Sequence, residues 1–268
     1  MNTPVSMCSA NELASFKRRL AKVDPILANL IRAAGKFTHT TSSQHSPFHS
    51  LARAIAHQQL NGTAAESIFG RFVGLYAMDG KATALLEAEL VLDTPDEKMR
   101  AVGLSFAKIA SIKDLAAKTL SGVVPPSEIL HTLADDEIVE RLTQVRGIGR
   151  WTVEMMLMSR LGRPDVLPVD DFGVRNGFRL TYGLRGMPTQ RALAEFGSRW
   201  APFRSVAAWY LWRAVDLHRA GKLPPPATPT RIKVVKKKAA KKVATRKAKR
   251  AAKPRAKSAK RTRRATRR

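Results

Sequence analysis

The stretch 142–178 constrains the fold of this chain more than any other. Apolar residues recur at helical spacing before and after Gly147-Ile148-Gly149, which predicts two helices joined by a tight turn. Glycines at both ends of the turn permit positive φ and leave backbone N–H groups uncovered at the start of the second helix, where a phosphate group can bind. Arg146 and Arg150 add positive charge on either side. The sequence therefore predicts a helix-hairpin-helix, although a glycine turn by itself also occurs in helix pairs that bind nothing.

Two carboxylates follow the hairpin. A proline-bearing loop, 163–168, leads to Asp170 and Asp171, and a new apolar-periodic run begins at Phe172. Either acid could serve only as an N-cap of that helix. A phosphate anchor followed by an acid at this distance resembles the helix-hairpin-helix/Gly-Pro-Asp DNA glycosylase superfamily. Residues 147–152 are most similar to its 3-methyladenine DNA glycosylase II (alkylbase glycosylase) branch.

The resemblance assigns the catalytic acid to Asp171, the last residue of a Pro-x-x-Asp motif. Asp170 is then the neighbour that caps or orients, at the border of the base pocket. Cleavage of an N-glycosidic bond builds positive charge on the sugar, which an ionised carboxylate stabilises while it orients the attacking water. A position at a helix N-terminus favours that ionised form through the helix dipole.

Trp151 occupies the position where lyase members of the superfamily carry a lysine that forms a Schiff base with the sugar. An indole cannot act as that nucleophile, so the sequence predicts a monofunctional glycosylase, a hydrolase of N-glycosyl bonds that uses water. Two alternatives stay open. One is a non-catalytic helix-hairpin-helix DNA-binding protein, and the other is a bifunctional glycosylase/lyase that recruits another lysine.

Aromatic residues predict the base pocket. N-alkylated purines such as 3-methyladenine and 7-methylguanine carry positive charge, and a cation-π contact with an indole contributes about 2 kcal/mol when desolvated. The pocket is assigned to Trp151 and Trp212, together with Met155, which stands where relatives carry an aromatic residue. Trp200 and Trp209 are expected in the core.

A second DNA contact is predicted at a polar interruption between two helical runs, where Gln58, Gln59 and Leu60 lie. In the resembled family the matching segment enters the minor groove, and one side chain fills the gap left by the extruded nucleotide. Which of the three is inserted stays open, as does the alternative that the glutamines only cap helix ends. The predicted DNA-binding residues are Gln58, Gln59, Leu60, Arg146, Gly147, Ile148, Gly149, Arg150 and Thr152.

No cofactor is expected. The single cysteine, Cys8, excludes a disulfide framework and the four-cysteine iron–sulfur cluster that some members of the superfamily carry. The only metal that the resemblance suggests is a monovalent cation at the hairpin carbonyls of Val145 and Gly147.

The basic charge is concentrated in residues 231–268. This segment holds 20 of the 48 Lys and Arg residues and no acidic residue, which leaves 28 basic and 21 acidic residues, or +7 of the total +27, in the rest of the chain. Its composition predicts a disordered tail that binds DNA non-specifically, although a solubilising or RNA-binding extension is an alternative. Residues 223–230 form a Pro-rich linker.

The predicted fold is all-α, with about ten helices in two lobes. The glycosylase domain is expected at 1–222, with its N- and C-terminal helices in one lobe and the catalytic cleft between the lobes. A helix is expected over 76–93, and Thr94 is expected to cap the next one. No apolar run approaches the length of a membrane span. We expect the protein to be a monomer that acts on double-stranded DNA containing damaged bases. Its expected location is the cytoplasm, in association with the nucleoid, or the nucleus if the protein is eukaryotic.

Overall fold

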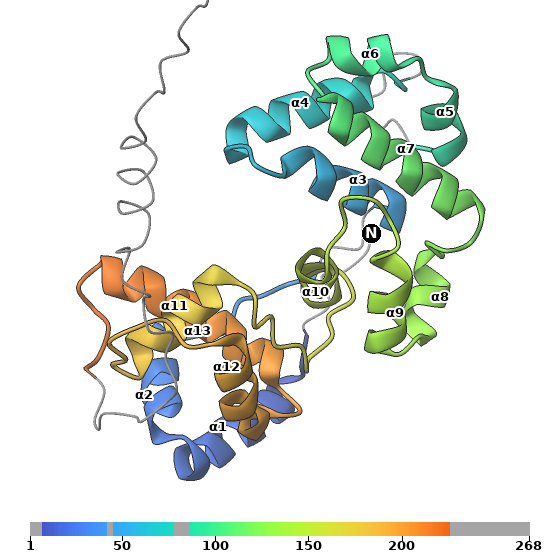
Figure 1. Cartoon of the computed structure of the whole chain (residues 1–268). Helices are drawn as coiled ribbons and strands as arrows, with labels where there is room; N and C mark the ends of the chain where they lie inside the picture. The colour runs from blue at the N-terminus through green and yellow to red at the C-terminus, as the bar shows by residue number, and fades with distance from the viewer. Residues whose placement is uncertain (1–6, 42–44, 78–85, 226–268) are drawn as a thin grey trace, which may run out of the picture. The chain divides into compact units, whose positions relative to one another are not determined.

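The computed structural model describes residues 7–41, 45–77 and 86–225. The chain divides into two units, Met1–Val234 and Val235–Arg268, and all of the described residues belong to the first. They form thirteen α-helices and one 3-10 helix joined by loops, which confirms the all-α prediction (Figure 1).

One group of helices contains the first and the last helices of the described residues, which pack together. Asp24 accounts for much of that arrangement, because its buried carboxylate caps the second helix and also accepts hydrogen bonds from Tyr182 Oη at 2.7 Å and Trp200 Nε1 at 2.8 Å. Gly177 leaves no room for a side chain against the Leu211 backbone, so two of the later helices pack closely. The group consists of α1 (Ala10–Val23), α2 (Pro25–Ala34), α11 (Phe172–Thr181), α12 (Gln190–Gly197), η1 (Ser198–Trp200) and α13 (Arg204–Arg219).

The middle of the chain forms the second group. Helices α3, α5 and α6 all pack against α7, and α4 packs against α3. The two groups correspond to the two predicted lobes. The members are α3 (Pro47–His57), α4 (Gly62–Gly74), α5 (Ala88–Asp93), α6 (Asp96–Ala101), α7 (Phe106–Leu120), α8 (Ser127–Thr132) and α9 (Asp135–Leu142).

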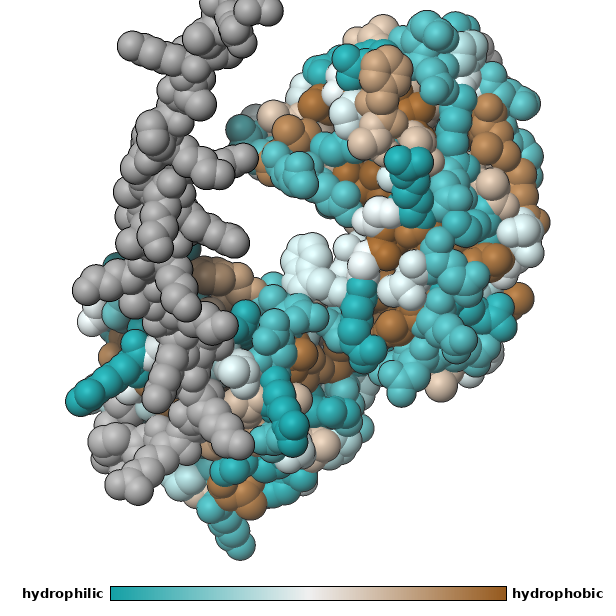
Figure 2. All heavy atoms as spheres, viewed as in Figure 1, coloured by the Kyte–Doolittle hydropathy of each residue, from teal (hydrophilic) through white to brown (hydrophobic). Residues whose placement is uncertain are grey.

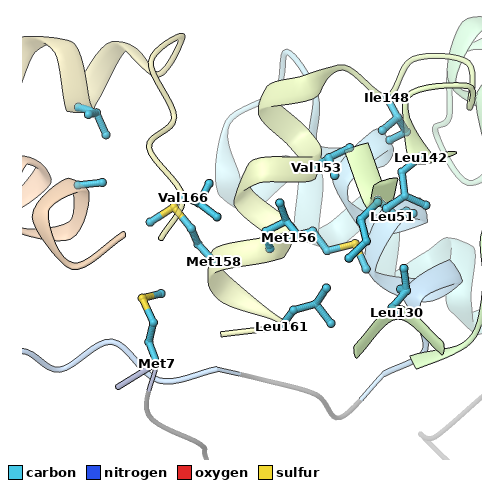
Figure 3. Packing of buried hydrophobic residues seen from close by; sticks show 14 of the residues in the cluster. Met7, Leu51, Leu130, Leu142, Ile148, Val153, Met156, Met158, Leu161 and Val166 are labelled. Atoms are coloured by element: carbon cyan, nitrogen blue, oxygen red, sulfur yellow. The ribbon is translucent and has the colours of Figure 1, made fainter. Parts of the chain in front are cut away.

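Helix α10 (Arg150–Ser159) follows the hairpin and packs against α9. Its apolar face carries Val153 and Met156, which belong to one buried cluster with Leu51 and Leu142 (Figure 3). The opposite, polar faces of the helices are solvated, and the face of the molecule in Figure 2 is mostly hydrophilic with scattered apolar patches. Burial of one side of α10 fixes the direction of the side chains on its other side.

Two local predictions were wrong. A continuous helix was expected over 76–93, but the residues that follow α4 form a turn, and α5 begins only at Ala88. Residues 78–85 lie outside the described residues. Thr94 does not cap α6, because its hydroxyl donates to the Leu90 carbonyl at 2.7 Å in the preceding helix. A side chain that bonds backward along the chain is not available to the helix that follows it.

The predicted basic tail, 231–268, and most of the predicted linker lie outside the described residues; of the linker, only 223–225 are described. In the part of the chain that the structure covers, no helix combines the length and the apolar character that crossing a bilayer requires.

Candidate active site

Asp171 is the N-cap of α11 and accepts three hydrogen bonds. Its Oδ1 accepts from the Val174 N–H at 2.7 Å and from Trp212 Nε1 at 2.8 Å, and its Oδ2 accepts from Trp151 Nε1 at 2.9 Å. Asp171 is therefore an N-cap whose carboxylate also binds two indole N–H groups, and the capping role does not exclude the catalytic role predicted for it. Three donors from different directions hold the carboxylate in one orientation.

The glycine two residues after Asp171 is required by this arrangement. A Cβ on Gly173 would lie 2.7 Å from Trp212 Cδ1 and 3.1 Å from Asp171 Oδ1. Only a residue without a side chain lets the Trp212 ring reach the carboxylate. The sequence analysis did not single out this position, since a glycine near a helix start has many uses.

Asp170 does not have the role expected for it. The helix begins at Phe172, so the capping position falls on Asp171, and Asp170 is exposed one residue earlier. Asp170 also does not line the cavity described below. The capping role expected for Asp170 is therefore wrong, because α11 starts at Phe172, and its assignment to the border of the base pocket stays a prediction.

The hairpin has positive φ at the first of its two glycines, whereas Gly149 is extended, with φ −97°. Gly147 adopts φ +78°, and a Cβ there would lie 2.9 Å from Ser111 Oγ, so both the backbone conformation and the packing require glycine. Gln58 Nε2 donates to the Gly147 carbonyl at 2.8 Å. The glutamine turn and the hairpin are thus joined directly, although 89 residues separate them in the sequence.

The hairpin is also tethered to α7. The backbone N–H of Arg146 donates to Asp114 Oδ2 at 2.7 Å, and Lys118 Nζ donates to the same oxygen at 2.6 Å. Burial works to raise the pKa of Asp114, but these two donors outweigh it and hold that pKa below its usual range. Asp114 therefore fixes the start of the turn as an ionised acceptor.

The N-terminus of α10 is open to solvent. Its N-cap is Gly149, which provides no side-chain cap, so the first N–H groups of the helix have no partner within it. Arg146, Gly147 and Arg150 are exposed around it, and an anion can approach these donors. This surface has the charge and geometry expected of a phosphate-binding hairpin.

Two predicted DNA-binding side chains do not belong to that surface. Ile148 is 4% exposed and belongs to the buried apolar cluster, whereas Thr152 is 9% exposed and lines the cavity described below. Neither side chain is exposed on the hairpin surface. Their assignment to DNA binding therefore stays a prediction that concerns the backbone of the motif rather than these side chains.

The glutamine turn separates its three residues. Gln58 is half-buried and bonded to the hairpin, whereas Gln59 and Leu60 are exposed. Gln59 has φ +59°, the only positive φ of a non-glycine residue in the described parts of the chain. Neither glutamine side chain caps α4, since Asn61 Oδ1 accepts the Ala64 N–H instead.

A cavity of about 820 Å³ lies along α3, α4 and α10. Trp151 and Met155, two of the four predicted pocket residues, line it. Trp212 does not line it but reaches Asp171, which in turn contacts Trp151. The aromatic edge of the cavity and the carboxylate are therefore adjacent.

The other two tryptophans lie away from this cavity. Trp200 is fully buried, as expected. Trp209 is partly exposed and packs edge-on against Phe37, with ring centroids 4.9 Å apart. The prediction that both tryptophans lie in the core is confirmed for Trp200, whereas Trp209 is only partly buried and packs against the core.

The carbonyls suggested for a monovalent cation are already engaged. Val145 O accepts the Ile148 N–H at 3.0 Å, and Gly147 O accepts Gln58 Nε2 at 2.8 Å. Within the described residues no group of three or more His, Cys, Asp or Glu side chains could hold a metal ion. Each carbonyl oxygen keeps a second lone pair, so a monovalent cation at this position stays a prediction, and no step below depends on one.

One buried acid near the site was not predicted. Glu154 is 4% exposed, and its Oε1 accepts from Arg150 Nε at 3.0 Å. Burial raises the pKa of Glu154, and the nearby carboxylates of Asp170 and Asp171 act in the same direction. The four-residue spacing of Arg150 and Glu154 was the available signal in the sequence.

Comparisons with known proteins agree with this geometry. A family model described as HhH-GPD superfamily base excision DNA repair protein matches residues 52–202. DNA-3-methyladenine glycosylase 1 of Schizosaccharomyces pombe is 40% identical over 206 residues, which span 76% of this chain and 89% of that protein.

Two solved structures are also similar. The S. pombe 3-methyladenine DNA glycosylase (Mag1) in complex with abasic DNA is 39% identical with a TM-score of 0.64, over 74% of this chain and 95% of that one. A DNA-3-methyladenine glycosidase from Bacillus halodurans is 33% identical with a TM-score of 0.69, over 82% of this chain and 95% of that one. The family match contains the glutamine turn, the hairpin and Asp171. The chain therefore belongs to the HhH-GPD superfamily of base excision DNA repair proteins.

Proposed function

We propose that this protein is a monofunctional DNA glycosylase that hydrolyses the N-glycosidic bond of alkylated purines, such as 3-methyladenine and 7-methylguanine, in duplex DNA. The observation that carries the proposal is the carboxylate of Asp171, held by the indole N–H groups of Trp151 and Trp212 at the edge of the cavity. The names of the similar proteins support the same substrate class.

The mechanism follows from charge. As the bond to the base breaks, positive charge develops on the sugar, and Asp171 stabilises it and orients the attacking water. An alkylated purine already carries positive charge, so it departs as a neutral base and needs little acid assistance. The exposed indole of Trp151 offers that cation a π-face in the cavity.

Other features grip the DNA. The uncovered N-terminus of α10, with Arg146 and Arg150, binds backbone phosphate, while Gln59 or Leu60 enters the space left by the extruded nucleotide. The tail 231–268, joined through the linker 223–230 to the glycosylase domain 1–222, adds non-specific affinity. The protein acts as a monomer on DNA in the nucleoid, or in the nucleus of a eukaryote.

The lyase alternative lacks a suitable amine. No lysine lines the described cavity. Lys108, in α7, donates from Nζ to the Ala56 carbonyl at 2.6 Å. Water is therefore the nucleophile in this proposal.

The test is release of methylated bases from alkylated duplex DNA by the full-length protein. We expect wild type to release 3-methyladenine and 7-methylguanine and to leave intact abasic sites. Asp171→Asn should abolish release while DNA binding is retained, and the neighbouring Asp170→Asn should stay active. Failure of wild type to release any base would reject the enzyme, and a borohydride-trapped adduct would favour the lyase.

A further inference from the structure

Arg160 is a buried cation that has no anionic partner among residues 7–41, 45–77 and 86–225. It is 6% exposed, and it donates from Nη1 to Ser50 Oγ at 3.2 Å and from Nη2 to Ser127 Oγ at 2.7 Å. Both partners are neutral, and the buried Nε has no hydrogen-bond partner among the described residues. Burial lowers the pKa of Arg160, and the field of Glu128 opposes this only in part. Buried arginines are normally paired with acids, so a missing partner points to a ligand.

Arg160 lines the same cavity as the aromatic edge of the active site. Trp151, Met155 and Ser159 are four residues apart on one face of α10, and all three line the cavity together with Arg160. From Trp151 to Arg160 the helix rises about 13 Å. Since Trp151 contacts Asp171 and also lines the cavity, the cavity extends from the neighbour of the carboxylate to Arg160.

The end of the cavity near Arg160 is electropositive. His49 stacks on His45, with ring centroids 4.1 Å apart, and both line the cavity. Burial lowers the pKa of His49 to about 4, and His45, Arg53 and Arg160 contribute to this shift. Arg53 is neutralised by Glu66 at 2.6 Å, which leaves Arg160 as the uncompensated charge. This environment resists a further positive charge and favours an oxygen acceptor.

We propose that Arg160 is a specificity-determining residue that binds the oxygen-bearing edge of an extruded neutral oxopurine, such as hypoxanthine, within the cavity. The inference rests on the proposed glycosylase function, because it needs the sugar of the extruded nucleotide at Asp171. A base that enters between Trp151 and α3 directs its far edge along α10 toward the guanidinium. Ser50 and the neutral ring of His49 flank that edge.

The charge of Arg160 matters most for a neutral base. When the bond between C1′ and N9 breaks, its electron pair stays on N9 and the purine departs as an anion. Water forms the new bond to C1′ and loses one proton, and the released purine takes up one proton, so the reaction balances. A cation fixed at the far edge stabilises the negative charge of the departing purine. For 3-methyladenine, which is already cationic and has no oxygen, the same charge gives no such stabilisation.

A structural role for Arg160 makes a different prediction. If the residue only ties α10 to α3 and α8 through Ser50 and Ser127, its loss should lower the release of every base equally. Ser127 does not line the cavity, so Ser127→Ala removes one tie and keeps the charge. This variant is the matched control.

The experiment compares single-turnover release of hypoxanthine and 3-methyladenine by the full-length protein on matched duplexes. We expect wild type to release both. Arg160→Met should slow hypoxanthine release by about a hundredfold and 3-methyladenine release by less than about threefold. Ser127→Ala should leave the ratio of the two rates unchanged. If Arg160→Met does not fold, Arg160→Lys replaces it, and it should also slow hypoxanthine release more than 3-methyladenine release.

Three results are distinguishable. Equal slowing of both substrates by Arg160 variants would overturn the inference, as would release of 3-methyladenine but not hypoxanthine by wild type. Release of neither base would instead reject the proposed function on which the inference rests.

Discussion

The indole Nε1 of Trp151 donates a hydrogen bond to Oδ2 of Asp171 at 2.9 Å, across 20 residues of sequence. Trp212 donates to the other oxygen from α13, at 2.8 Å. The hairpin helix and the C-terminal helix therefore meet at one carboxylate. This contact makes the tryptophans orienting groups for the acid as well as aromatic surfaces.

Replacing Trp151 by Phe tests this orienting role. The substitution keeps an aromatic ring but removes the N–H donor, and a hydrogen bond to a charged acceptor contributes about 1.5–3 kcal/mol. We expect single-turnover base release to fall about tenfold to a hundredfold, with little change in DNA affinity. Trp209→Phe is the control, since that indole packs on Phe37 and does not contact Asp171. A comparable loss in the control would argue against the orienting role.

Gly173→Ala tests the contact between Trp212 and Asp171, and Gly70→Ala is the control at a glycine away from that contact. The added methyl group would meet Trp212 Cδ1 at 2.7 Å and displace that ring from Asp171. We expect base release to fall by at least tenfold, because a hydrogen bond to a charged acceptor contributes about 1.5–3 kcal/mol. Gly70→Ala in α4 meets nothing within 4 Å and should raise the free energy of unfolding by about 0.5–1 kcal/mol. Unchanged activity in Gly173→Ala would show that the Trp212 contact is dispensable.

The Asp114 tether predicts a pH-dependent stability. Its pKa in the folded protein is lowered, so its contribution to stability is complete above the ordinary aspartate pKa of about 3.9 and is lost as the pH falls through the lower, folded value. Asp114→Asn should cost about 1–2 kcal/mol at pH 7 and progressively less below that range, measured by urea unfolding. Asp136→Asn, at a side chain 96% exposed, should show no such trend. A penalty for Asp114→Asn that is constant with pH would contradict the ionised tether.

The structure of the glutamine turn favours Gln59 or Leu60, rather than Gln58, as the side chain that enters the duplex. Gln58 is held by Gly147, so extrusion of the damaged nucleotide should depend on Gln59 or Leu60. A fluorescent base analogue at the damaged position measures this extrusion. Gln59→Gly relieves a left-handed conformation and should raise the free energy of unfolding by about 1 kcal/mol. Slower extrusion in Gln59→Gly but not in Leu60→Ala would assign the wedge to Gln59, and the reverse would assign it to Leu60. Normal extrusion in the double variant would exclude both.

Deletion of residues 228–268 tests the basic tail. Each phosphate neutralised by Lys or Arg steepens the fall of affinity with salt, so the truncated protein should bind undamaged duplex with a shallower slope of log K against log salt. Cleavage at saturating enzyme should be nearly unchanged. A collapse of that cleavage rate would mean that the tail takes part in catalysis.

Several features of the site could be predicted because their signals are local. Gly147 must adopt positive φ next to Ser111, and a glycine at a predicted turn indicates such a conformation. Asp171 precedes a helical run, which indicates an N-cap. The low exposure of Ile148 and Thr152 could not be predicted in the same way. A motif alternates between buried and exposed positions, and only the packing of α10 decides which residues are which.

The helical class, the hairpin and the N-cap position of Asp171 could be predicted from sequence, because turn glycines, caps and helical periodicity act over a few residues. Which distant groups reach that acid, and which residues line the cavity beside it, depends on tertiary packing. Trp212 lies 41 residues from Asp171, and Ser50 lies 110 residues from Arg160. Contacts of this kind depend on how helices pack, and no pattern of neighbouring residues encodes them.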